Sequence, residues 1–330
     1  MQISLVTLAS NPRVRPPFHT VRHSRGVTEI WPSPPIAAAP LVLRGRRFDA
    51  AHPAVMGIVN RTPDSFYAAA RYTDLEPGLV AVDRLIAEGA DLIDVGGVRA
   101  GQQGGEVSVE AEIGRVRPFL LAVRERHPDV ILSLDTWRSE VAAACAPAGV
   151  DLINDTWAGA DSDLLAVAAE LGAGYVVSHT GGLPPRTDPV NISYGPDPDD
   201  VVHDVLAGLA AGASRAVAAG VPAERVLIDP TLDFGKTTRH SLRVLRATGA
   251  VAGLGFPVLQ ALSRKDFVGE TLDLAVDERL FGTLAATAIA GWLGTTVFRA
   301  HDVVATRQVV DMVASVRGER PPLVAVRGEP

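Results

Sequence analysis

Lysine is nearly absent from this sequence. Its 330 residues include only two lysines, Lys236 and Lys265, against 29 arginines. Arginine therefore supplies almost every generic positive charge, and each remaining lysine is a candidate for a position that needs a compact ammonium group on a thin stem. The alternative, that codon bias alone removed the other lysines, stays open.

Cysteine is also scarce, because Cys145 is the only one in the chain. A single cysteine cannot form an internal disulfide, and the alanine-rich surroundings favour a buried, unreactive side chain over a thiol site. A reducing, cytoplasmic location fits this composition.

Several missing signals exclude whole classes of function. No apolar run reaches the ~20 residues of a membrane-spanning helix. The net charge of −7 argues against nucleic-acid or membrane-surface binding, which needs a basic field. The segment DPTLDFGKT ends like a P-loop but has Pro230 where that motif needs glycine. No zinc-ligand spacing and no G-x-S-x-G motif occur.

The chain divides into three parts by composition. Residues 1–50 contain seven prolines and seven arginines with only two acids, and they show no sustained periodicity. We expect a disordered or loosely attached extension there, either an upstream addition or, less simply, an organelle transit peptide. Residues 51–318 form the expected domain, and residues 319–330 form a second short tail.

Strand and helix patterns alternate throughout the central part. Eight short apolar runs predict buried parallel strands, and each is followed by a stretch with helical spacing. The runs are 54–60, 90–95, 130–135, 150–154, 174–179, 225–229, 257–262 and 296–300. Eight such units are the number that closes a (β/α)8 TIM barrel, an α/β fold of one domain. An open doubly wound sheet is the alternative, but its nucleotide-binding fingerprint is missing.

Polar residues follow every predicted strand. In a barrel of this kind the carboxyl ends of the strands meet at one mouth, which predicts a ligand site there. The ends are Asn60, Asp94, Asp135, Asn154 with Asp155, His179, Asp229, Ser263 to Lys265, and Arg299 with His301. Asp135, Asn154 and Asp229 suit a flat heterocycle with adjacent N–H donors, because a carboxylate accepts two parallel N–H groups.

A second group of strand ends favours an anion. Asn60, Arg299 and His301 come from the first and last strands, which are neighbours in a closed barrel. An amide, a guanidinium and an imidazole together indicate a phosphate or pyrophosphate site with Mg²⁺, a metal that commonly bridges phosphate oxygens. His301 taken alone could equally be a structural histidine.

Ordered motifs connect these residues to a known family. In sequence order they are MGIVNRTPDSF, DLIDVGG, SLDTW, DLINDTW, SHTGG, LIDPTLDFGKT, ALSRKDFVG, RLFGTLAATA and FRAHDV. Together they resemble the dihydropteroate synthases, the pterin-binding barrel enzymes of folate synthesis, from about Met56 to Val316. Members of this family join a dihydropterin methyl pyrophosphate to the amine of p-aminobenzoate, and pyrophosphate leaves.

The resemblance implies a role for each matching residue. Asp135, Asn154 and Asp229 would hold the edge of the pterin, Lys265 would reach its carbonyl and N5 side, and Phe234 would wall the pocket. Asn60, Arg299 and His301 would hold the pyrophosphate, with Asn60 also near Mg²⁺. Lys265, Arg299 and His301 would be the catalytic residues, and Lys236 would belong to the structure or the pocket rim. A homodimer is also implied.

The departures from the family cluster in the loops for the second substrate. Tyr67 to Arg71 replace a polar, glycine-bearing segment, and Val98 to Val107 lack the threonine and proline of the aminobenzoate pocket, with Arg99 displaced. Asp266 replaces a serine and would repel a benzoate carboxylate. Arg61 replaces a small apolar residue, and Ser178 replaces a methionine that often packs on the pterin.

This pattern resembles the divergent second-copy branch of the family, the inactive dihydropteroate synthases. Three readings stay open. The first is a pterin-pocket barrel with weak or no synthase activity. The second is a working synthase in which Arg61, Arg71 or Arg99 replaces the lost loop groups. The third is a barrel that uses the pocket for another pterin or folate.

Overall fold

The computed structural model describes the backbone of strands β1 (Phe18–Arg22) and β2 (Thr28–Pro32) and, in full, residues 39–61, 75–99, 106–187 and 192–327. The first predicted loop and most of the second lie outside the described residues. The chain forms two units, Met1–Pro35 and Ile36–Pro330. In the first unit β1 pairs with β2 as an antiparallel hairpin.

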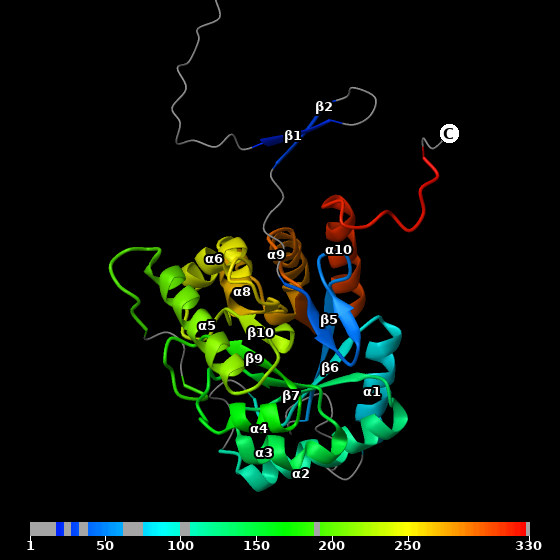
Figure 1. Ribbon diagram of the computed structural model, residues 1–330, viewed down its shortest axis with the longest axis vertical. Helices are drawn as coiled ribbons and strands as arrows, with labels where there is room; N and C mark the ends of the chain where they lie inside the picture. Colours follow the sequence, from blue (N-terminus) through cyan, green and yellow to red (C-terminus); the bar gives the residue numbers. More distant parts are fainter. Residues whose placement is uncertain are drawn as a thin grey trace, which may run out of the picture. The chain divides into compact units, whose positions relative to one another are not determined.

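The second unit is the predicted α/β barrel (Figure 1). Its eight strands are all parallel and hydrogen bond in the order β10-β9-β8-β7-β6-β5-β12-β11, and a bridge between Ile228 and Val258 joins the two ends. The strands are β5 (Ala54–Asn60), β6 (Leu92–Gly96), β7 (Ile131–Asp135), β8 (Leu152–Asp155), β9 (Gly174–Ser178), β10 (Val226–Asp229), β11 (Leu259–Ala261) and β12 (Val297–Ala300). The predicted (β/α)8 fold is confirmed, with all eight strands within about two residues of their expected positions.

Helices connect these strands and cover the outside of the sheet. They are α1 (Glu76–Ala87), α2 (Val109–Arg126), α3 (Ser139–Ala144), α4 (Leu164–Glu170), α5 (Asp200–Ala218), α6 (Thr238–Arg246), α7 (Thr248–Ala252), α8 (Asp266–Leu272), α9 (Leu280–Trp292) and α10 (Val303–Val316). The main hydrophobic core fills the space between these helices and the strands. This arrangement leaves the carboxyl ends of the strands free to form a site.

A short hairpin closes the opposite end of the barrel. Strands β3 (Leu41–Leu43) and β4 (Arg46–Phe48) pair antiparallel through Arg44 and Gly45, which both have positive φ angles, as a two-residue hairpin turn requires. Leu41, Leu43 and Phe48 are buried in a second apolar cluster, to which all eight barrel strands contribute residues such as Met56, Leu92 and Ile131.

Charged side chains hold this hairpin to the amino-terminal ends of the strands. Arg44 donates to Asp151, the residue before β8, and Arg46 donates to Asp91, the residue before β6. The predicted boundary at residue 50 is therefore wrong, because residues 41–48 belong to the barrel unit. The proline- and arginine-rich composition concealed three apolar side chains that fill the barrel floor.

Helix α5 is the single helix in the described parts of the chain that is long and apolar enough to cross a membrane by length and composition alone, with 19 residues and a mean hydropathy of 1.2. It contacts β9 and β10, and its Val201, Val205 and Leu209 are buried in the barrel core. These contacts are those of a core helix, and a soluble core helix passes the same length test.

Candidate functional site

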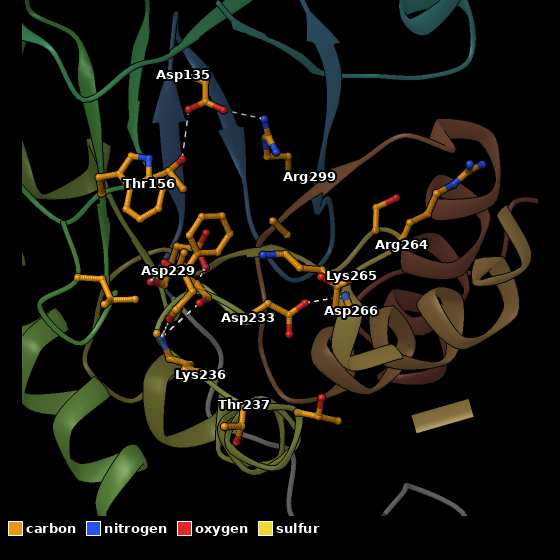
Figure 2. A pocket seen from close by; sticks show the side chains of 18 of the residues that line it. Asp135, Thr156, Asp229, Asp233, Lys236, Thr237, Arg264, Lys265, Asp266 and Arg299 are labelled. Carbon is orange, nitrogen blue, oxygen red and sulfur yellow. Dashed lines mark hydrogen bonds and ion pairs between the residues drawn. The ribbon is translucent and has the colours of Figure 1, made fainter. Parts of the chain in front are cut away.

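A cavity of about 800 Å³ opens at the carboxyl ends of the barrel strands. The structure brings seven of the eight predicted site residues into its wall, namely Asp135, Asn154, Asp229, Phe234, Lys265, Arg299 and His301. Figure 2 shows side chains from distant parts of the sequence converging on this space. The expected meeting of strand ends at one mouth is therefore found for these seven residues.

A chain of charges crosses the inner end of the cavity. Arg299 donates from Nε to Asp94 Oδ2 at 2.6 Å. Its Nη2 donates to Asp135 Oδ2 at 2.9 Å (Figure 2). Asp94 is fully buried and also accepts hydrogen bonds from Ser133 at 2.5 Å and from Asn154 at 3.2 Å. Asp94 thus fixes both Arg299 and Asn154, a role that its position at a strand end indicated but did not specify.

Two carboxyl groups of the cavity have pKa values above the ordinary value for aspartate. Burial raises the pKa of Asp135, and the nearby Arg299 only partly opposes that effect. Burial also raises the pKa of Asp229, whose Oδ1 accepts the backbone N–H of Thr231 at 2.7 Å. Thr156 donates to the other oxygen of Asp135 at 3.2 Å. A ligand that donates N–H groups to these carboxylates would relieve the cost of burying their charge.

Lys265 lies on an aromatic ring at the cavity wall. Its Nζ donates to the carbonyl of Leu232 at 2.5 Å and lies 4.5 Å from the ring centroid of Phe234. Burial lowers the pKa of Lys265. Phe234 in turn packs edge-on against Trp157, with ring centroids 5.3 Å apart. This wall provides one cation and two aromatic surfaces beside the carboxyl groups.

The second lysine has a different environment. Lys236 is buried, and its Nζ donates to the carbonyls of His179, Thr231 and Phe234 at 2.7, 3.2 and 2.9 Å. Burial lowers its pKa to about 7. Lys236 therefore ties the loop after β10 to the end of β9, as the expected structural role requires. Both lysines line the cavity, which agrees with the inference drawn from their scarcity.

The predicted anion group is only partly assembled. His301 lines the cavity, and its Nδ1 lies 3.0 Å from the hydroxyl of Ser263. Asn60 ends β5 next to Gly96 of β6 but is not among the residues that line the cavity. The described residues contain no cluster of three or more His, Cys, Asp or Glu side chains that could hold a metal ion. The Mg²⁺ site at Asn60 stays a prediction.

Arg61 does not point into the cavity. Its guanidinium lies over the ring of Phe119 on α2, 4.8 Å from the centroid, and the residue is buried. Of the three arginines considered as replacements for lost loop groups, Arg61 is thus taken up by packing. Arg99 is exposed, and Arg71 lies outside the described residues.

Asp266 stands at the cavity mouth with a partner that sequence reasoning missed. Its carboxylate is 77% exposed and pairs with Arg279 at 2.7 Å, while the Arg279 side chain is largely buried. Arg279 follows in the chain by 13 residues, and no spacing rule connects the two. The pairing reduces, without removing, the expected repulsion of an incoming carboxylate.

Trp157 is a further cavity residue that was not predicted. It is the second residue after β8, and its backbone N–H donates to Asp155 at 2.9 Å. The hydroxyl of Ser178 accepts from the N–H of Ala158 and donates to the carbonyl of Asp155, so it fixes the same turn. Ser178 therefore acts on the cavity through this turn. The signal for Trp157 was its place two residues after a strand end.

Comparison with known proteins gives the same assignment. Residues 56–301 match the family model described as "Pterin binding enzyme". A Mycobacterium leprae protein named inactive dihydropteroate synthase 2 is 54% identical over 288 residues, which are 87% of this chain and 98% of that protein. The dihydropteroate synthase of Haemophilus influenzae is 36% identical, over 82% of this chain and 96% of the enzyme. A Yersinia pestis dihydropteroate synthase, solved with a sulfonamide drug, is 32% identical with a TM-score of 0.76, over 85% of this chain and 100% of that one.

Proposed function

Since this chain belongs to the pterin-binding enzyme family and is a homologue of the dihydropteroate synthases, we propose that its cavity binds a pterin and that its synthase activity is weak or absent. The single observation that carries the proposal is the convergence of Asp135, Asn154, Asp229, Lys265 and Arg299 on one cavity. A pterin edge offers adjacent N–H donors and a carbonyl, which complement two carboxylates and an ammonium group.

The anion end of the pocket is proposed to take the diphosphate arm. Arg299 and His301 supply donors there, and Asn60 is proposed as one ligand of a Mg²⁺ ion whose other ligands are diphosphate oxygens and water. When bound, that metal would offset charge on the leaving diphosphate. The residues of the chain itself orient the ring, hold the arm and keep Lys265 beside the aromatic wall.

Weak turnover is proposed because the elements that would take the second substrate are altered. The loops at residues 62–74 and 100–105 lack the groups expected from the family resemblance. The exposed carboxylate of Asp266 stands at the mouth. A relative that shares 54% identity carries the name inactive dihydropteroate synthase 2. An enzyme that holds its first substrate but cannot orient the second loses rate much more than stability.

We further propose that the protein is a cytoplasmic homodimer. Helices α9 and α10 pack against each other, and they expose large apolar side chains, with Phe281 83% and Met312 64% accessible. Exposed apolar groups on adjacent helices are typical of a surface that a second copy covers. Sedimentation of wild type and Phe281→Glu tests this, and a monomeric wild type at micromolar concentration would contradict it.

Calorimetry with a dihydropterin that carries a methyl diphosphate arm tests the main proposal. We expect binding by the wild type and at least about tenfold weaker binding by Asp135→Asn, because the ring would lose a charged acceptor. Asp199→Asn is the matched control, since the Asp199 side chain is exposed and pairs with Arg243, and neither residue lines the cavity. Failure of the wild type to bind would overturn the pterin assignment.

Turnover is measured separately by diphosphate release on addition of p-aminobenzoate. The proposal predicts a rate far below that of Haemophilus influenzae dihydropteroate synthase under the same conditions. A working synthase is the second candidate, and the pairing of Asp266 with Arg279 favours it because a paired carboxylate repels a benzoate less. That candidate predicts normal turnover that is lost in Arg99→Ala.

A further inference from the structure

Three consecutive residues of the loop between β10 and α6 surround Lys265. The carbonyl of Leu232 accepts from Lys265 Nζ at 2.5 Å, and the ring of Phe234 lies 4.5 Å from the same nitrogen. Asp233 lies between these two residues in the chain and contacts the backbone that follows Lys265. Its carboxylate accepts the N–H group of Asp266 at 2.7 Å (Figure 2). It also accepts the N–H group of Phe267 at 3.3 Å.

Asp233 occupies a backbone conformation that is unusual for its residue type. Its φ angle is 71°, in the left-handed region that favours glycine. A conformation of this kind persists where surrounding contacts over-determine it. Here the fully buried hydroxyl of Ser241 accepts the Asp233 N–H at 3.1 Å and donates to its carboxylate at 3.2 Å. The side chain of Asp233 therefore has a fixed direction.

The contacts of Asp233 act at the root of the Lys265 side chain. Lys265 is the residue immediately before α8 and has an extended backbone, with φ −63° and ψ 154°. The two N–H groups that Asp233 holds are those of the next two residues. The loop thus contacts Lys265 at two places. The Leu232 carbonyl accepts a hydrogen bond from the ammonium group, and Asp233 binds the backbone of the two residues after Lys265.

We infer that Asp233 is a positioning residue that holds Lys265 against Phe234 and aims its ammonium group at the ring of the bound ligand. The inference rests on the proposed pterin pocket for its ligand, but the geometry of Asp233 and Lys265 stands by itself. A glycine at this position would remove the backbone strain but would also lose the hydrogen bonds of the carboxylate to Asp266 and Phe267. An asparagine would tolerate the backbone and keep one acceptor but lose the charge.

The charges that face Lys265 come from several elements, and they make the role measurable. Burial lowers the pKa of Lys265, while Asp233 is the strongest of the carboxylates that raise it, followed by Asp229 of β10. Arg299 of β12 lowers it, and Asp266 at the start of α8 raises it. Removing the charge of Asp233 is therefore expected to lower the pKa of Lys265. Both Asp233→Asn and Asp233→Gly remove that charge, so a larger change in Asp233→Gly reports the loss of the backbone contacts.

The near absence of lysine makes the measurement simple. In protein labelled only at lysine side-chain carbons, the spectrum contains two lysine signals, from Lys236 and Lys265, and Lys265→Arg assigns them. The full chain is titrated as wild type, Asp233→Asn, Asp233→Gly and the control Asp199→Asn. We expect the Lys265 midpoint to fall in both Asp233 variants and to stay unchanged in the control, while Lys236 changes less.

Ligand binding is measured on the same four proteins with the dihydropterin diphosphate. We expect about tenfold weaker binding by Asp233→Gly and a smaller loss for Asp233→Asn, which keeps one acceptor. Thermal unfolding shows that each variant is folded. Asp233→Gly is expected to fold, because glycine adopts the left-handed backbone without strain.

The outcomes separate the two proposals. If the wild type binds no pterin, the proposed function fails, and the lysine titration alone decides the role of Asp233. If the wild type binds and both Asp233 variants bind equally well with an unchanged Lys265 signal, the positioning role is overturned. A shifted Lys265 signal together with weaker pterin binding in the Asp233 variants supports both the pterin pocket and the positioning role of Asp233.

Discussion

Substitution of Asp94 by asparagine is predicted to destabilise the protein and to loosen Arg299. Asp94 is fully buried and accepts three hydrogen bonds, from Ser133, Asn154 and Arg299. Asparagine has the same shape, but its amide nitrogen is a donor. Arg299 and Asn154 both donate to Oδ2, so the amide oxygen would have to take that position and leave the nitrogen facing the Ser133 hydroxyl, which can accept. Even in that orientation Arg299 loses the negative charge of Asp94.

The magnitude follows from which contacts survive. Loss of one partner of a buried ion pair costs ~3–5 kcal/mol when the remaining charge is left without compensation. Arg299 keeps its second carboxylate, Asp135 at 2.9 Å, and its side chain is 19% exposed, so compensation is partial. We therefore expect a loss of about 3 kcal/mol in the free energy of unfolding.

The assay is urea unfolding of wild type, Asp94→Asn, Arg299→Met and the double variant. If the pair is coupled as the distances indicate, the sum of the stability losses in the two single variants should exceed the loss in the double variant by more than about 1 kcal/mol. A loss below about 0.5 kcal/mol for Asp94→Asn, or additive single effects, would refute the reasoning.

Further predictions concern the aromatic wall, the barrel floor and a buried lysine. Pterin binding should quench tryptophan fluorescence in the wild type and much less in Trp157→Phe, because Trp157 is a tryptophan of the cavity wall; equal quenching would exclude contact with the ligand. Leu43→Ala should lower the free energy of unfolding by about 2–5 kcal/mol, whereas Arg47→Ala, at an exposed position, should stay within about 0.5 kcal/mol. Burial lowers the pKa of Lys236 to about 7, whereas the ordinary lysine value is 10.5. Between these two pH values the unfolded state binds more protons than the folded state does. The free energy of unfolding of the wild type should therefore rise with pH across this range, relative to that of Lys236→Met. A flat difference between those two proteins across this range would contradict that environment for Lys236.

The strand positions and the location of the site could be predicted from the sequence because both depend on local patterns. A run such as Leu152–Asp155 is apolar and then abruptly polar, and the parallel barrel brings every such transition to one mouth. The pattern was therefore sufficient to predict the fold and seven residues of the cavity wall.

The unpredicted features depend on partners that are distant in the sequence. The pairing of Arg279 with Asp266 and the contacts of Asp233 with α8 arise only after the loops have folded beside each other. The β3–β4 hairpin escaped notice because strands of three residues carry too few side chains to show a period. Arg61 looked like a loop cation, yet a ring 4.8 Å away takes it into the packing.

The hairpin at the floor also determines where a shortened expression clone should start. A clone that begins at Ala51, where composition changes, would retain every barrel strand but would expose Met56, Leu92 and Ile131 to water from below. One that begins a few residues ahead of Leu41 would keep the barrel sealed. Researchers who prepare minimal versions for crystals or spectra should therefore preserve these eight residues, Leu41 to Phe48, even though they lie upstream of the first family motif.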